Sequence, residues 1–153
     1  MTEAATAERV DAILRAHQGL EGPLLPILHA VQAEFGLIPA AAVAPIAKAL
    51  TLTRAEVEGV ISFYHDFRRV PAGRHVIKLC RAEACQSMGG AATLARMEAA
   101  LGLKIGQTRA DVTLEAVYCL GLCACAPAAM VDGRLIGRLD DAKVAEIAAE
   151  VSA

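Results

Sequence analysis

Five cysteines are the residues of this chain best suited to chemistry. Four residues separate Cys80 from Cys85, three separate Cys119 from Cys123, and Cys125 follows two positions later. Each pair comes directly after an apolar stretch that predicts a strand, so two loops could converge at one edge of a sheet. Four thiolates brought together in this way could hold a tetrahedral zinc ion or an iron–sulfur cluster.

The spacing of the pairs favours the iron–sulfur cluster. Cysteine pairs on zinc commonly enclose two residues, which makes a tight loop around one small ion. A [2Fe–2S] core is larger, because each of its two irons takes two thiolates, and wider intervals suit it. Zinc and unligated cysteines both stay open at this point. A thioredoxin-type redox dithiol is disfavoured, since the chain has no C-x-x-C.

Three neighbouring features bear on such a cluster. Gly121 lies inside the second pair, where the missing side chain would let backbone N–H groups approach a sulfur. Ser87 is expected to cap a helix over 87–101, with Gly89-Gly90 near its start, so that helix N–H groups could face the cluster. Cys125 is interpreted as a small buried thiol, with a free thiol able to replace a lost ligand as the alternative.

The elements that must position these cysteines divide the chain in two. Residues 1–72 are predicted to form a helical bundle of four apolar patterns with helical period, the last of which begins with the capping box Thr53-x-x-Glu56. Residues 73–153 predict the order β-α-β-β-β-α, with strands over 75–80 and 112–119 and a hairpin around Asp132-Gly133. The predicted fold class is therefore α/β, an N-terminal helical bundle followed by a small sandwich of thioredoxin-like type.

Composition and apolar patterning argue against several classes of partner and location. The net charge of −2 gives no reason to expect nucleic acid as a partner. No apolar run reaches the ~18–20 residues that a membrane span needs, and the N-terminus has no apolar core typical of a signal peptide. We therefore expect a cytoplasmic, reducing location, where cysteine clusters more often bind metal than form disulfides. No glycine-rich nucleotide loop is present, so NAD and FMN sites are expected on other chains.

Longer segments resemble a known family. "LCRAEAC" and "YCLGLCACAPAAMVDGRLIGRL" resemble the thioredoxin-like [2Fe–2S] subunit that lies beside the flavin subunit of respiratory complex I (NADH dehydrogenase). "LLPILHAVQAEFGLIP" and "LTRAEVEGVISFYHDFRRVPAGRHVIKLC" are similar to its helical region. The resemblance covers nearly the whole chain and implies that Cys80, Cys85, Cys119 and Cys123 are the four ligands of one [2Fe–2S] cluster, leaving Cys125 as a non-ligand.

Within this family, "FYHDFR" and "CLGLCACAPAAMVDGRL" look most like the gamma subunit of the soluble NAD-dependent molybdenum formate dehydrogenase. The resemblance implies an electron-transfer subunit of an oxidoreductase complex, without catalytic residues of its own. FMN, further Fe–S clusters and the molybdenum cofactor would lie on partner subunits, one flavin- and NAD-binding and one large and molybdenum-containing. The equivalent subunit of NADH:quinone oxidoreductase or of a bidirectional NAD-reducing hydrogenase, a free-standing ferredoxin and a zinc-stabilised interaction module are the alternatives.

Overall fold

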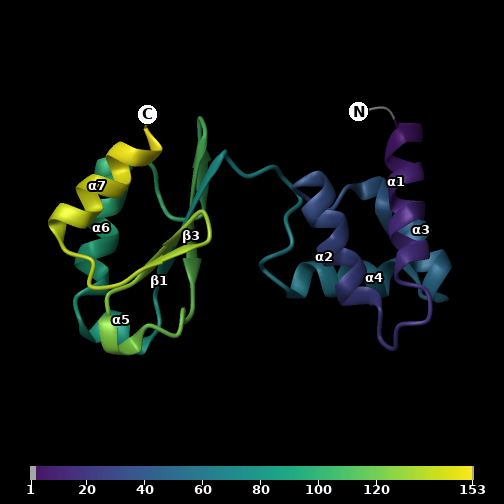
Figure 1. Cartoon of the computed structure of the whole chain (residues 1–153), viewed down its shortest axis with the longest axis horizontal. Coiled ribbons are helices and arrows are strands. Elements are labelled where there is room, and N and C mark those ends of the chain that lie inside the picture. The colour runs from purple at the N-terminus through teal and green to yellow at the C-terminus, as the bar shows by residue number, and fades with distance from the viewer. Residues whose placement is uncertain (1–2, 153) are drawn as a thin grey trace. The chain divides into compact units, whose positions relative to one another are not determined.

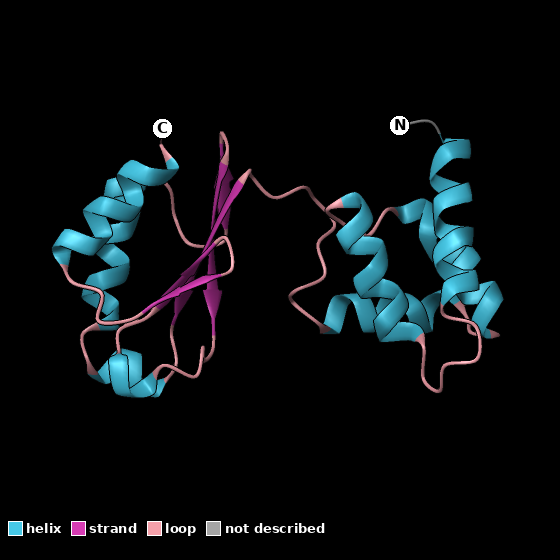
Figure 2. Ribbon diagram, in the orientation of Figure 1, coloured by secondary structure: helices cyan, strands magenta, loops and turns pink. Residues whose placement is uncertain are grey.

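The computed structural model describes residues 3–152 and divides the chain into two compact units, one up to Pro71 and one from Ala72. Residues 1–2 and 153, the ends of the two predicted domains, lie outside the described residues. The first unit is helical and the second combines helices with a sheet (Figure 2). Within the described part of the chain, no helix is both long enough and apolar enough to cross a membrane.

The helical unit contains α1 (Glu3–Ala16), α2 (Leu24–Phe35), α3 (Ala40–Leu50) and α4 (Arg54–Phe63). Its core is aliphatic, with Leu28, Val31, Val43 and Val57 fully buried. Gly36 ends α2 in the left-handed conformation, and Pro45 lies inside α3. The predicted capping box is present, because the Thr53 side chain accepts from the Glu56 N–H while Glu56 accepts from the Thr53 N–H.

The second unit is built on a five-stranded sheet in the order β2-β3-β1-β4-β5. Its strands are β1 (His75–Cys80), β2 (Gln107–Arg109), β3 (Val112–Val117), β4 (Ala129–Val131) and β5 (Arg134–Ile136). The central strand β1 pairs parallel with β3 and antiparallel with β4. The predicted hairpin is confirmed, since β4 and β5 flank Asp132-Gly133. Strand β2, which pairs antiparallel with β3, was not expected.

Helices α6 (Gly90–Leu101) and α7 (Asp141–Val151) pack beside each other on one face of this sheet (Figure 1). Their apolar side chains bury the inward positions of the strands: Met97 from α6 and Ile147 from α7 share a core with Ile77, Leu79 and Leu114. The unit is therefore a two-layer α/β structure, which leaves the loops at the ends of the strands to carry the cysteines.

The predicted helix over 87–101 is wrong in its first turn. The chain forms a short helix α5 (Glu83–Ser87), and α6 starts only at Gly90. Ser87 is the last residue of α5, and its hydroxyl donates to the Ala84 carbonyl at 2.9 Å, so it does not cap α6. Gly89 separates the two helices with a φ of +85°, a conformation that glycine adopts without strain.

Candidate metal centre

The topology of β1 and its two neighbours brings both cysteine pairs to one end of the sheet. Cys80 is the last residue of β1 and pairs with Val117 at the end of the parallel strand β3, two positions before Cys119. Strand β4 runs antiparallel to β1, so its first residues also lie at this end. The turn that precedes β4, the 3-10 helix η1 (Cys123–Cys125), therefore lies here too, against α5.

The first pair is enclosed. Cys80 and Cys85 are 4% and 2% exposed and form a small apolar cluster with Ala128. Two main-chain hydrogen bonds fix the end of β1, where the Cys80 N–H donates to the Ala128 carbonyl at 3.0 Å and the Arg81 N–H to the Val117 carbonyl at 2.8 Å. A third, from the Gln86 N–H to the Ala82 carbonyl at 3.0 Å, closes the first turn of α5 around Cys85. The two thiols are thus held by regular structure on both sides.

The second pair is open to solvent. Cys119 and Cys123 are exposed. Cys119 lies in the loop after β3, which ends at Val117 rather than at the predicted residue 119, and Cys123 opens η1. The Gly121 N–H donates to the Cys119 sulfur at 3.4 Å, so the expected approach of a backbone N–H to a sulfur is present. Cys119 has a φ of +106°, which is rare for a residue with a side chain. Such backbone strain is typical of residues held in place for a function.

The pKa of the Cys80 thiol lies below its ordinary value. Burial alone would raise it, because the charged form loses water, but hydrogen bonds to the sulfur outweigh this. They come from the backbone of Ala82, Cys119 and Leu120 and from the Cys85 side chain. Main-chain groups of both cysteine loops therefore converge on one sulfur. This is an environment prepared for a thiolate, the form in which cysteine binds metal.

The pKa values of Cys85 and Cys123 are shifted in the opposite direction, above the ordinary value of a thiol. Burial raises the pKa of Cys85, and so do its hydrogen bond with Cys80 and the charges of Cys80 and Cys123. The pKa of Cys123 is raised mainly by its hydrogen bond with Cys119, then by the charge of Cys119 and more weakly by burial and the charge of Cys80. The raised pKa values of Cys85 and Cys123 thus reflect the proximity of their pair partners and the charge of the other pair.

Two kinds of metal centre use four cysteine ligands and can be compared at this site. Cys80 ends β1 and Cys85 lies on α5, whereas Cys119 and Cys123 belong to the connection between β3 and β4. A tetrahedral zinc ion would draw all four sulfurs equally close, but a [2Fe–2S] core takes two thiolates on each iron. Among the residues that the structure describes, no group of three or more His, Cys, Asp or Glu side chains is arranged to hold a metal ion. The preference for a two-iron cluster therefore comes from the spacing of the cysteine pairs.

Cys125 lies apart from these interactions. Its Cβ faces the main chain of Gly137, where an added Cβ would stand 2.7 Å away, and its carbonyl accepts from the Arg138 N–H at 2.6 Å. The side chain is half-buried against this segment. Its contacts therefore agree with the interpretation of Cys125 as a packed thiol.

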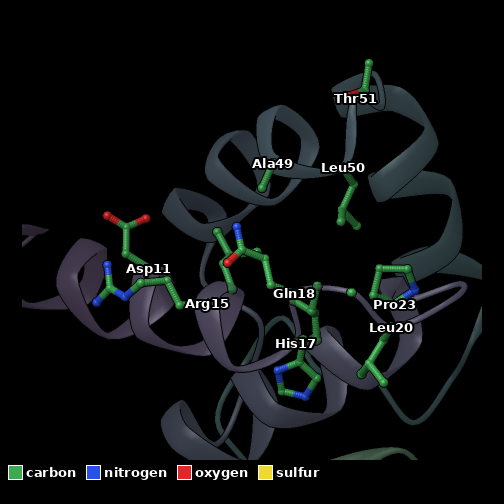
Figure 3. A pocket seen from close by; sticks show the side chains of 12 residues that line it. Asp11, Arg15, His17, Gln18, Leu20, Pro23, Ala49, Leu50 and Thr51 are labelled. Carbon is green, nitrogen blue, oxygen red and sulfur yellow. The ribbon is translucent and has the colours of Figure 1, made fainter.

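A hollow of 540 Å³ lies in the helical unit, which carries none of the five cysteines. It opens between the end of α1 and the end of α3 (Figure 3), where Arg15, Gln18 and Leu50 line it. His17 also lines it, and its Nδ1 lies 2.8 Å from the Ile13 carbonyl oxygen one turn earlier. The hollow therefore shares no residue with the cysteine site.

Comparison with known proteins shows which proteins the chain is similar to. The family described as thioredoxin-like [2Fe–2S] ferredoxin matches residues 10–152. The NADH-quinone oxidoreductase of Pseudomonas aeruginosa has a component that is 39% identical over 107 residues, which is 69% of this chain and 64% of that relative. The HndA component of the NADP-reducing hydrogenase of Solidesulfovibrio fructosivorans is 33% identical over 132 residues, which is 85% of this chain and 77% of that relative.

A solved structure also matches. The crystal structure of an NAD⁺-reducing [NiFe]-hydrogenase in the air-oxidized state superposes with a TM-score of 0.72 at 30% identity, over 85% of this chain and 23% of the hydrogenase chain. The present chain thus spans less than two thirds of the length of some relatives. The predicted α/β, thioredoxin-like fold class is confirmed. The match over residues 10–152 shows that the chain belongs to the thioredoxin-like [2Fe–2S] ferredoxin family.

Proposed function

We propose that Cys80, Cys85, Cys119 and Cys123 ligate one [2Fe–2S] cluster and that the chain is an electron-transfer subunit of an NAD-linked oxidoreductase complex. The observation that carries this proposal is the placement of both cysteine pairs at one end of β1, where Cys80 lies beside the end of β3 and η1 contacts α5. A [2Fe–2S] cluster carries one electron at a time, which suits exchange with a flavin on a partner subunit.

The chain's own residues hold and shield the cluster. Burial of Cys80 and Cys85 keeps water from one pair, while the loop of Cys119 and Cys123 leaves the other pair accessible to a redox partner. Backbone N–H groups aimed at sulfur, such as that of Gly121, stabilise added negative charge and so raise the reduction potential. The protein therefore contributes ligation, hydrogen bonding and controlled exposure.

For the complex itself we propose a cytoplasmic NAD-dependent formate dehydrogenase, in which this chain is the gamma subunit. Its partners would be a flavin- and NAD-binding subunit and a large molybdenum-containing subunit. This finer assignment is supported by the segments "FYHDFR" and "CLGLCACAPAAMVDGRL". The relatives in NADH-quinone oxidoreductase and NADP-reducing hydrogenase support the equivalent subunit of either complex equally well. We also propose that residues 1–72 and 73–153 are separate domains.

Metal and acid-labile sulfide per chain, measured in a Cys125→Ser variant purified without oxygen, test the cluster. We expect two irons and two sulfides per chain and no zinc. Cys119→Ser is the matched variant, and it should lose the cluster while Cys125→Ser keeps it. Zinc in place of iron would instead support an interaction module without a redox role. Loss of the cluster in Cys125→Ser would mean that the second ligand pair is assigned wrongly.

To identify the oxidoreductase complex, the native assembly must be isolated. A tagged chain isolated from its own cells should bring down its partner subunits, which are then analysed for molybdenum and FMN and assayed for NAD⁺ reduction by formate. Nickel with H₂-dependent NAD⁺ reduction would assign a hydrogenase. NADH-dependent quinone reduction by the isolated assembly would assign complex I. Either result would overturn the formate dehydrogenase assignment and keep the electron-transfer role.

A further inference from the structure

The turn that carries Cys123 depends on its neighbours for its position. η1 is a single 3-10 turn of three residues, held internally by the Cys125 N–H on the Leu122 carbonyl at 2.8 Å and a longer bond of 3.4 Å from Ala126 to Cys123. So short a turn has few hydrogen bonds of its own. The segments that η1 contacts therefore contribute to the position of the Cys123 sulfur, and α5 is one of them.

The segment behind η1 is Gly137–Leu139, which we call the strap and which links β5 to α7. The Arg138 N–H donates to the Cys125 carbonyl at 2.6 Å, and the Leu139 N–H donates to the Pro127 carbonyl at 3.0 Å. A Cβ at position 137 would lie 2.7 Å from the Cys125 Cβ and 2.9 Å from the Cys125 oxygen. The strap thus runs in direct contact with η1, and only glycine fits at position 137.

Lys143 connects the strap to α7. Its Nζ donates to the Gly137 carbonyl at 2.8 Å and to the Arg138 carbonyl at 3.2 Å. Lys143 lies in the first turn of α7, where its own N–H donates to the side chain of Asp140, the N-cap residue, at 2.9 Å. Helix α7 is in turn anchored in the core by Val144 and Ile147. Hydrogen bonds from a charged donor are roughly twice as strong as neutral ones.

From these contacts we infer that Lys143 is a positioning residue for the cluster: it holds the strap, and the strap holds the Cys123 turn. The inference rests on the proposed function, because it takes Cys123 as a ligand. Without Lys143, the carbonyls of Gly137 and Arg138 lose a donor that α7 anchors in the core. The strap can then shift, and the Cys123 thiolate moves with it. Loss of partners that orient a ligand costs about 10–100-fold in metal affinity.

The first test compares Lys143→Met with the wild type as full-length chains, both purified without oxygen. Iron and sulfide content, the electron paramagnetic resonance (EPR) g values of the reduced protein, and the rate of iron release to a ferrous chelator are measured. We expect release about tenfold faster in Lys143→Met, with shifted g values. Lys143→Arg keeps a charged donor and should restore both. Lys48→Met removes the same charge from an exposed position on α3 and should behave as wild type.

A second variant perturbs the strap without any change of charge. Gly137→Ala should also speed iron release and shift the g values, because its methyl group meets Cys125. Gly59→Ala is its control, since a Cβ there would meet no atom within 4 Å. If Lys143→Met does not fold, Gly137→Ala still tests whether the strap positions the Cys123 turn.

The outcomes separate the two proposals. A wild-type chain that binds no iron and sulfide would overturn the proposed function, and with it this inference. A loaded wild type whose g values and iron release are unchanged in Lys143→Met and Gly137→Ala would overturn the positioning role alone. Shifted g values that Lys143→Arg restores would support it, because a merely structural loss of stability would not move the spectrum of the clusters that remain bound.

Discussion

The main chain at Gly90 lies directly against the carbonyl group of Cys85. A Cβ at position 90 would stand 2.6 Å from the Cys85 oxygen and 2.9 Å from its carbonyl carbon. A Cβ does not come so close to a carbonyl oxygen or carbon unless one of them shifts, and here the obstacle is backbone. The start of α6 and the helix α5, which carries the proposed ligand Cys85, are therefore in contact through a residue without a side chain.

Gly90→Ala is expected to displace Cys85 and to weaken the cluster. The added methyl group should cost about 1–3 kcal/mol of unfolding free energy, which is typical of overpacking. Denaturant unfolding and iron content per chain measure the two effects. Gly59→Ala, which introduces the same methyl group into open space on α4, is the control. Unchanged iron content in Gly90→Ala would mean that α6 moves aside without moving the ligand.

In the cluster-free chain, the more exposed thiols should be alkylated before the buried ones. Cys119 and Cys123 are exposed, whereas Cys80 and Cys85 are buried, so iodoacetamide should modify the second pair first. Peptide mass analysis over a time course gives the order. In the iron-loaded chain both pairs should be protected, while Cys125 reacts at the same rate in both samples. Equal rates for the four cysteines would contradict the enclosed geometry of the first pair.

The two units have separate cores, and a mutation in one should leave the other intact. Leu28 is fully buried in the helical core, so Leu28→Ala should destabilise that unit by about 2–5 kcal/mol. The absorbance and EPR spectra of the cluster should not change, because Leu28 contributes nothing to the core around the sheet. Thermal unfolding followed by circular dichroism, beside the cluster spectrum, makes the comparison. Loss of the cluster together with the helices would contradict separate domains.

The Asp132 carboxylate should make the stability of the second unit depend on pH in the acid range. Burial would raise the pKa of this carboxyl, but hydrogen bonds with His75 and the Val76 N–H and the charges of His75 and Arg134 outweigh it, and the pKa falls below its ordinary value of 3.8. The charged form is thus favoured by folding, so its stabilisation is present above 3.8 and is lost as pH falls through the lowered pKa.

Asp132→Asn removes this stabilisation. The variant should be less stable at about pH 7, and the stability lost between neutral pH and the acid range should be smaller than in the wild type. Asparagine tolerates the φ of +49° at this position, so the substitution adds no backbone strain to the measured difference in stability. The effect should be modest, because 41% exposure lets solvent screen the pair. Urea unfolding midpoints across this pH range provide the measurement, and parallel curves would contradict the assignment.

Local sequence signals predicted much of this structure. The Thr53–Glu56 box and the Asp132-Gly133 hairpin depend on neighbouring residues alone, so both could be read from the sequence. The cysteines were expected to follow strands because the apolar stretches before them have the length of strands. Their convergence needs parallel pairing of β1 with β3, which a β-α-β order implies.

Other features depend on contacts between distant segments and left no local signal. All three residues of β2 are exposed, so no alternation of apolar residues marks it as a strand. The break before α6 arises from the fit of Gly90 against Cys85, and Ser87 merely resembles a helix cap in the sequence. Lys143 reads as an ordinary surface lysine, and only the fold brings it to the strap behind η1.

The two edges of the sheet restrict how another protein can meet this unit. Strands β2 and β5 form the edges, and each has only three residues. Charged side chains accompany them, with Arg109 on β2 and Arg134, which is paired with Glu150, on β5. Short, charged edges offer little free backbone for a further strand. A second chain therefore has little to gain by extending the sheet, and association must use side-chain surfaces of helices and loops.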